Sequence, residues 1–107
     1  MTLTKEFHKS DSNFEKLIDK EPISVVLFKT NMCENCVDAM VNLHFLKEKN
    51  IPIHVVDVMK DKILSEKYSV EVVPTVVIFR DGRVQHHLQG RRNKFEYQSK
   101  LKQSSVI

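Results

Sequence analysis

The chain has 107 residues, 41% of them hydrophobic and 29% charged, which is typical of one soluble globular domain spanning residues 1–107. Its net charge of +3 comes from charges of both signs scattered along the chain, so we expect no nucleic-acid partner. No stretch approaches the roughly 18 apolar residues of a membrane span, and residues 1–20 lack the apolar segment of a signal peptide. We therefore expect no membrane association and a cytoplasmic location.

The first half of the chain alternates helical and strand patterns. Residues 10–20 place apolar side chains at helical spacing after Ser10 or Asp11, either of which suits a helix N-cap. Residues 23–29 are mostly apolar or β-branched on consecutive positions, which indicates a strand buried on both faces. Residues 33–49 contain no Gly or Pro and repeat apolar residues at helical spacing, which predicts the longest helix of the chain.

The second half continues this alternation, with a strand over 51–58, a short helix followed by a connection over 61–70, a hairpin over 74–88 and a closing helix up to about 103. The Asp81-Gly82 pair between the two hairpin strands is a strong turn signal. A further strand over 5–8 has only a weak pattern. Strands that alternate with helices and end in a hairpin predict an α/β domain with three α/β/α layers and a central mixed sheet of four to five strands.

The two cysteines, Cys33 and Cys36, lie where a buried strand gives way to a helix. A disulfide that only staples the fold is rare in the cytoplasm, so a close pair there is more typical of redox or metal chemistry. Two side chains three residues apart in a first helical turn can form and break a disulfide without rearranging the fold. The helix N-terminus stabilises a thiolate on Cys33, which also has more access to water. We therefore expect Cys33 to attack a substrate disulfide and Cys36 to resolve the mixed disulfide.

A metal site and a pair of inert core cysteines are the alternatives to redox chemistry. Zinc needs about four ligands, and the histidines of the chain are His8, His44, His54, His86 and His87. No histidine has a ligand spacing to the cysteine pair, and the adjacent His86 and His87 would point to opposite faces of a strand. We expect no metal and no bound cofactor, only a redox-active disulfide.

The chain resembles the thioredoxin family from about residue 7 to 101. The features that carry the resemblance are the Cys-Glu-Asn-Cys motif after an apolar strand, the Val-Val-Pro-Thr sequence at 72–75, the Asp81-Gly82 turn and Gly90 before the last helix. The resemblance implies a thioredoxin-like fold with a cis peptide bond before Pro74, facing the cysteines. It also implies that the Val73 backbone pairs with an extended substrate, and that Met32, Val73, Pro74 and Gly90 form an apolar docking surface around Cys33.

The cysteine motif departs from the usual Trp-Cys-Gly-Pro-Cys of the family, because Met32, Glu34 and Asn35 replace the Trp, Gly and Pro. Loss of the proline usually makes such a pair more oxidising. Glu34 acts in the opposite direction, because a carboxylate beside Cys33 disfavours its thiolate. Glu34 and Asn35 are therefore expected to tune the redox potential.

The buried aspartate of the family, six residues before the first cysteine, corresponds here to Leu27, and the lysine that usually faces it corresponds to Val55. The usual route for deprotonating Cys36 is then missing. We expect water or Glu34 to take its place, or the resolving step to be slow.

The resemblance implies a monomeric thiol-disulfide oxidoreductase that reduces protein disulfides. Its electron donor would be a flavin-dependent thioredoxin reductase that uses NADPH, and ribonucleotide reductase would be a client. A glutathione-dependent glutaredoxin-like enzyme is a weaker alternative, because the Gly-Gly pair usual after the Val-Pro element of glutaredoxins is missing. A non-catalytic interaction module with a thioredoxin-like surface is a second alternative.

Overall fold

The structure of the chain is a computed structural model that describes residues 4–7 and 13–104. Its strands are β1 (Thr4–Phe7), β2 (Ile23–Lys29), β3 (Ile53–Asp57), β4 (Thr75–Arg80) and β5 (Arg83–Gln89). Its helices are α1 (Asn13–Lys20), α2 (Glu34–Asn42), α3 (Lys62–Lys67) and α4 (Lys94–Ser104), with a 3-10 helix η1 (His44–Lys47) after α2. Among the described residues, none of these helices is long and apolar enough to cross a membrane.

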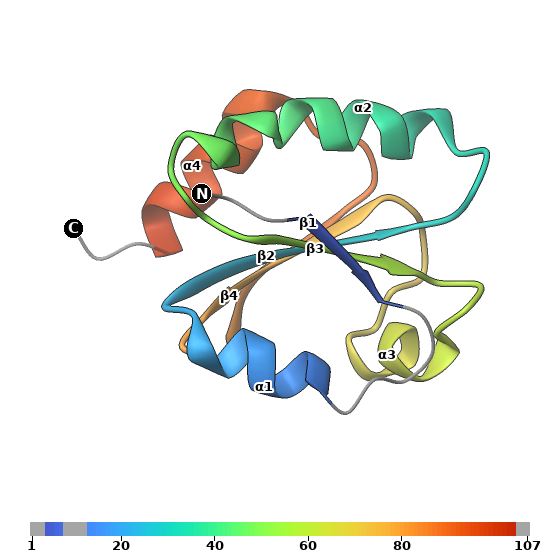
Figure 1. Cartoon of the computed structure of the whole chain (residues 1–107). Helices are drawn as coiled ribbons and strands as arrows, with labels where there is room; N and C mark the ends of the chain where they lie inside the picture. The colour runs from blue at the N-terminus through green and yellow to red at the C-terminus, as the bar shows by residue number, and fades with distance from the viewer. Residues whose placement is uncertain (1–3, 8–12, 105–107) are drawn as a thin grey trace.

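The strands form one mixed sheet in the order β1-β3-β2-β4-β5. Strands β1, β3 and β2 run parallel to one another, whereas β4 and β5 are antiparallel to their neighbours. Helices α2 and α4 cover one face of the sheet, and α1 and α3 cover the other (Figure 1). The predicted three-layer α/β/α architecture is confirmed, and the weakly predicted first strand is present as β1.

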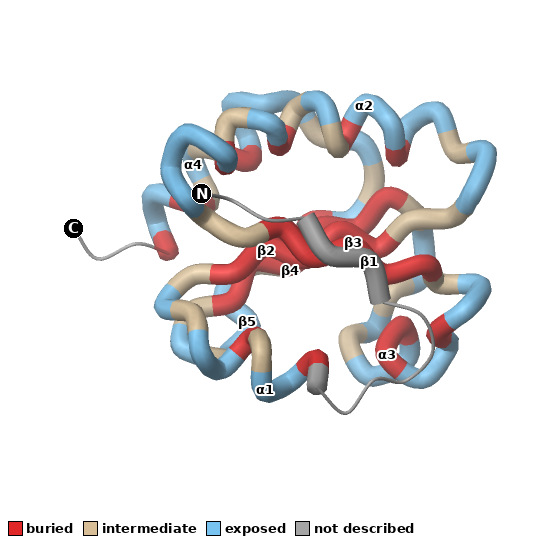
Figure 2. The backbone as a smooth tube through the Cα atoms, viewed as in Figure 1, coloured by how far each residue is buried: buried red, intermediate tan, exposed pale blue. Residues whose placement is uncertain are grey.

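The central strand β2 is buried on both faces, as its apolar sequence predicts. Val25 and Leu27 belong to the core cluster under α2 and α4, whereas Val26 and Phe28 belong to the cluster that contains Phe14 of α1. Figure 2 shows the buried residues concentrated along the strands, between helices whose outer faces are exposed. Each such side chain contributes about 1.5–3 kcal/mol by burial, so β2 gives its carboxyl end a rigid support.

The prediction of one helix over residues 33–49 is wrong. Helix α2 ends at Asn42, and the backbone N–H of Leu43 donates to both Ala39 O (3.0 Å) and Met40 O (3.2 Å). The 3-10 helix η1 follows, and Leu46 N donates to Leu43 O at 3.0 Å. A 3-10 helix aligns residues i and i+3, so the tightening lets Leu43 and Leu46, 1% and 0% exposed, face the same core. The longest helix is α4, with 11 residues.

The predicted hairpin is confirmed at the turn between β4 and β5. Asp81 and Gly82 both have positive φ, 50° and 81°, as a two-residue hairpin turn requires. A Cβ atom on Gly82 would lie 1.9 Å from Asp19 Oδ1, the end of an exposed side chain that can rotate away, so the positive φ is what favours glycine there. The predicted N-cap residues of the first helix, Ser10 and Asp11, lie outside the described residues.

The burial of the Tyr97 side chain in α4 allows a prediction of how the free energy of unfolding changes at alkaline pH. It is 1% exposed, its hydroxyl lacks a hydrogen-bond partner among the described residues, and burial raises the pKa of Tyr97 to about 12. The unfolded tyrosine ionises near pH 10, so stability is lost as the pH rises above 10. We expect Tyr97→Phe to match the wild type within about 1 kcal/mol at pH 7 and to exceed it by about 1 kcal/mol at pH 11. Urea unfolding at both pH values tests this, and parallel losses in the two proteins would contradict it.

Candidate active site

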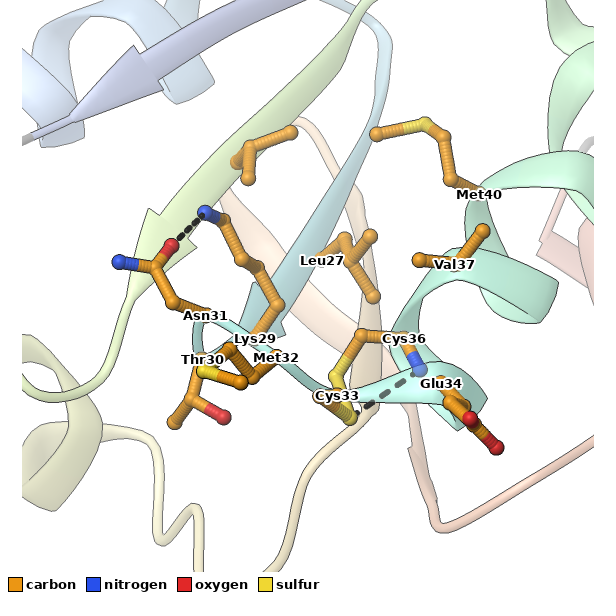
Figure 3. A pocket seen from close by; sticks show the side chains of 11 residues that line it. Leu27, Lys29, Thr30, Asn31, Met32, Cys33, Glu34, Cys36, Val37 and Met40 are labelled. Carbon is orange, nitrogen blue, oxygen red and sulfur yellow. Dashed lines mark hydrogen bonds between the residues drawn. A yellow bond between two sulfur atoms is a disulfide. The ribbon is translucent and has the colours of Figure 1, made fainter.

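The cysteine pair lies just beyond the carboxyl end of β2, at the start of α2. Cys33 is the N-cap of α2, with an extended backbone (φ −111°, ψ 105°), and its Sγ accepts a hydrogen bond from Cys36 N at 3.1 Å. A disulfide joins the two residues, whose Cα atoms are 5.2 Å apart (Figure 3). The helix therefore directs a backbone N–H at the Cys33 sulfur, which stabilises negative charge on that atom after reduction.

The two sulfurs differ in access to water. Cys33 is half-buried, whereas Cys36 is 5% exposed and packs into the sheet side of α2. The predicted difference in access is therefore confirmed. The roles built on it, attack by Cys33 and resolution by Cys36, stay a prediction.

A cavity of about 510 Å³ opens beside the disulfide, between the carboxyl ends of the strands and helix α2. Its lining residues are Leu27, Lys29, Thr30, Asn31, Met32, Cys33, Glu34, Cys36, Val37, Met40 and Val55. Figure 3 shows Leu27 on the sheet side, facing Val37 and Met40 of α2. The cavity is thus largely apolar next to the less accessible sulfur and open to solvent on its outer side.

Leu27 and Val55 form the inner wall of this cavity. They are directly paired in the register of β2 and β3, and they are 1% and 4% exposed. The predicted replacement of a buried acid and lysine by an apolar pair is therefore confirmed in position. Glu34, one of the groups expected to take over proton transfer, is exposed in the first turn of α2, as is Asn35. Their predicted effects on the redox potential stay predictions.

Lys29 and Asp57 form a charged pair at this site that the sequence analysis missed. They are paired in the register of β2 and β3, two residues beyond Leu27 and Val55, and so share the face of that pair. Lys29 Nζ lies 4.0 Å from Asp57 Oδ2, and Asp57 Oδ1 accepts a hydrogen bond from Met59 N at 2.9 Å. The sequence does contain a signal for this pair, because two apolar runs carry opposite charges, Lys29 and Asp57, at or near their carboxyl ends.

The docking residues implied by the resemblance come together in part. The Val73–Pro74 peptide bond is cis, as expected. Pro74 precedes β4, whose first residue pairs with Phe28 near the carboxyl end of β2, and Pro74 O accepts a hydrogen bond from Gly90 N at 2.8 Å. Pro74 and Gly90 therefore lie near the end of β2 that leads into the cysteine loop.

Met32, beside Cys33, is fully exposed with φ 56°, while Val73 is half-buried. Of the four docking residues, Met32 lines the cavity; Val73, Pro74 and Gly90 lie outside its lining. The shared docking surface stays a prediction.

The described histidines lie away from the cysteine cavity. His44 is exposed, as predicted, and His54 is buried in β3. His86 and His87 are half-buried on the edge strand β5, where His87 Nε2 lies 2.8 Å from Tyr68 O. Burial, and secondarily the charge of Lys100, lowers the pKa of His86. No group of three or more metal-ligating side chains occurs in residues 4–7 and 13–104, and His8 lies outside them.

Comparison with known proteins decides the family. The Thioredoxin family model matches residues 5–103 of the chain. The chain belongs to the thioredoxin family. The family match therefore agrees with the resemblance that the cysteine motif and the sequence around Pro74 carry.

Known thioredoxins match over different shares of the chain. Thioredoxin Y, chloroplastic, from Oryza sativa subsp. japonica is 28% identical over 83 residues, 74% of this chain and 49% of that protein, so the chain spans about half the length of this relative. A mutant thioredoxin from Halobacterium salinarum NRC-1 superposes with a TM-score of 0.85 at 18% identity, covering 99% of this chain and 92% of the other. The reduced Schistosoma mansoni thioredoxin gives 0.82 at 20% identity, over 95% and 98%. The two structures share the fold of this chain.

Proposed function

We propose that this thioredoxin-family protein is a thiol-disulfide oxidoreductase that reduces protein disulfides through the Cys33/Cys36 couple. The observation that supports it is the disulfide at the start of α2, between a half-buried N-cap cysteine and a buried cysteine one turn later. Such a pair alternates between dithiol and disulfide without moving the rest of the fold.

The proposed reaction moves two electrons from the protein to its substrate. In the reduced protein the Cys33 thiolate attacks one sulfur of a substrate disulfide, which forms a mixed disulfide and releases one substrate thiolate to be protonated by water. Cys36 then loses its proton to solvent, and its thiolate attacks Cys33 Sγ. The Cys33–Cys36 bond forms, and the second substrate sulfur leaves with the electron pair and takes a proton.

The surroundings of Cys33 suit a polypeptide substrate in this proposal. Met32 offers an exposed apolar side chain beside the attacking sulfur. At Gly90 a Cβ atom would meet no neighbour within 4 Å, so the surface at this glycine is open. The Val73 backbone is then available to pair with an extended substrate segment, the mode of recognition known as β-strand addition.

The partners belong to the same proposal. A flavin-dependent thioredoxin reductase that uses NADPH would return two electrons to the disulfide, and ribonucleotide reductase would be one client. The protein would act as a cytoplasmic monomer in electron transport and in redox homeostasis, with the Cys33–Cys36 disulfide as its redox group and no bound cofactor.

A redox titration tests the proposal. Metal-free protein is equilibrated in dithiothreitol or glutathione buffers, and the disulfide fraction is measured by alkylation and mass spectrometry. We expect a reversible two-electron transition whose midpoint potential is close to that of thioredoxin, about −270 mV. A midpoint nearer about −180 mV would contradict reduction as the direction, and absence of a transition with zinc retained would identify a metal site.

A double variant, Cys33→Ser with Cys36→Ser, addresses the interaction module, the second candidate. We expect it to lose all acceleration of insulin reduction by dithiothreitol, while full retention of the biological function would favour a non-catalytic module. Replacing dithiothreitol by glutathione in the same assay tests the glutaredoxin-like alternative, for which glutathione alone would sustain turnover.

A further inference from the structure

Lys29 brings a positive charge from the sheet to the cavity that contains both cysteines. It is the last residue of β2, and it lines this cavity together with Cys33 and Cys36. Its side chain is 20% exposed. Figure 3 shows it on the sheet side, across the cavity from the disulfide, with the ammonium directed toward Asn31. Its charge therefore lies at the wall of the cavity that both cysteines share.

Asp57 keeps the Lys29 ammonium at this wall. Asp57 is 1% exposed, and its Oδ1 is fixed by Met59 N, so that Oδ2 forms the ion pair with Lys29 Nζ at 4.0 Å. Lys29 Nζ also donates to Asn31 Oδ1 at 3.4 Å. The lysine side chain is long and flexible, and rotation about its carbon–carbon bonds can carry the ammonium from this wall toward the cysteine side of the cavity.

We propose that the Lys29 ammonium, whose charge Asp57 partly offsets, stabilises the thiolate of Cys36 and so promotes the resolving step. The inference rests on the proposed function, because the Cys36 thiolate forms when the mixed disulfide is resolved. Cys36 still gives its proton to solvent, and Lys29 lowers the cost of the charge that remains. In this way Lys29 and Asp57, two residues further along β2 and β3, would assist deprotonation of Cys36 in place of the acid and lysine that Leu27 and Val55 replace.

Electrostatics in the cavity favour this assignment. A positive charge near a thiol lowers its pKa, and the effect is larger where apolar walls limit screening. Among the side chains that the structure describes, the charged ones that line the cavity are Lys29 from β2 and Glu34 from α2, with Asp57 of β3 behind Lys29. Glu34 is exposed, and Asp38 of α2 pairs with Arg91 at 3.6 Å outside the cavity lining. The described part of β4 contributes no residue to that lining.

Titration of Cys36 alone tests the inference. Cys33→Ser removes the coupled thiol, and the thiolate of Cys36 is followed by its ultraviolet absorbance against pH. In this background Lys29→Met keeps the length of the side chain but removes the charge, and we expect the pKa of Cys36 to rise by about one unit, a tenfold lower thiolate fraction at pH 7. Lys29→Arg should restore the original value. Lys62→Met, an exposed lysine on α3, is the matched control and should leave it unchanged.

Asp57→Asn supplies a second variant with the opposite expected sign. An asparagine keeps an acceptor for Met59 N but removes the negative charge behind Lys29, so the pKa of Cys36 should fall below the wild-type value. A role in packing alone would not move the pKa in opposite directions in the two variants. An unchanged pKa in both variants, or a rise in both, would overturn the inference.

Kinetics with both cysteines present separate this inference from the proposed function. Lys29→Met should slow release of the mixed disulfide about threefold at pH 7, because the tenfold loss of thiolate is partly offset by its greater nucleophilicity, and should reach or exceed the wild-type rate as the pH rises. If the wild type resolves a mixed disulfide and Lys29→Met has the same pH profile, the Lys29 assignment fails while the function stands. If the wild type forms no mixed disulfide at all, the proposed function fails, and the titration of Cys36 still reports on Lys29.

Discussion

Cys33→Ser is expected to abolish catalytic reduction of a protein disulfide, by a factor on the order of a thousand or more, because a serine hydroxyl is not a thiolate at neutral pH. Cys36→Ser should leave the first attack intact and stop the reaction at the mixed disulfide. The asymmetry follows from the site, where Cys33 caps α2 and is half-buried, while Cys36 is 5% exposed.

The measurement is turnover with insulin as the substrate, followed by non-reducing electrophoresis and mass spectrometry of the protein. Cys36→Ser should accumulate a covalent adduct that dithiothreitol removes, and Cys33→Ser should form none. Val41→Ser is the matched control, because Val41 is 66% exposed on the same helix and lies outside the cavity lining. A stable adduct in Cys33→Ser but not in Cys36→Ser would reverse the roles of the two sulfurs.

Strong local patterns explain which elements the sequence predicts well. The strand over 23–29 matches β2 at both ends, since seven consecutive residues suit a strand and Pro22 precedes it. The hairpin is equally well defined, because Asp81 and Gly82 adopt the positive φ that such a turn requires. In both cases the information lies within about ten residues of the element itself.

Long-range alignment explains what the sequence analysis missed. Lys29 and Asp57 meet only because β2 and β3, far apart in the chain, are parallel neighbours in one particular register. A slip of one residue would place their side chains on opposite faces. The end of α2 at Asn42 was missed for a related reason, because the core that receives Leu43 and Leu46 is built by distant strands.

Leu27→Asp is expected to cost more stability than any surface change in this chain. Leu27 is 1% exposed and pairs with Val55, so the variant loses apolar packing and buries a carboxylate against an apolar neighbour. We expect a loss of about 4 kcal/mol or more at pH 7.5, enough to unfold a marginally stable domain. Burial raises the pKa of the new carboxyl above its unfolded value of about 4, so the deficit should shrink as the pH falls toward 4.

Urea unfolding of Leu27→Asp and Leu27→Asn at pH 4.5 and 7.5 measures this effect. The asparagine control has a similar shape without a titrating charge, so its deficit should not change between the two pH values. A Leu27→Asp protein within about 1 kcal/mol of the wild type at pH 7.5 would show that the wall of the cavity admits water.

Adding Val55→Lys to Leu27→Asp places an ammonium at the paired position of the next strand and should recover part of the loss, through a coupling of about 1–3 kcal/mol. The double variant then carries two charged pairs on one face, since Lys29 and Asp57 lie two residues further along. If Lys29 already stabilises the Cys36 thiolate, the restored acid should add little to the resolving rate. A large gain in that rate would instead mean that the wild-type site lacks a working substitute for the missing acid.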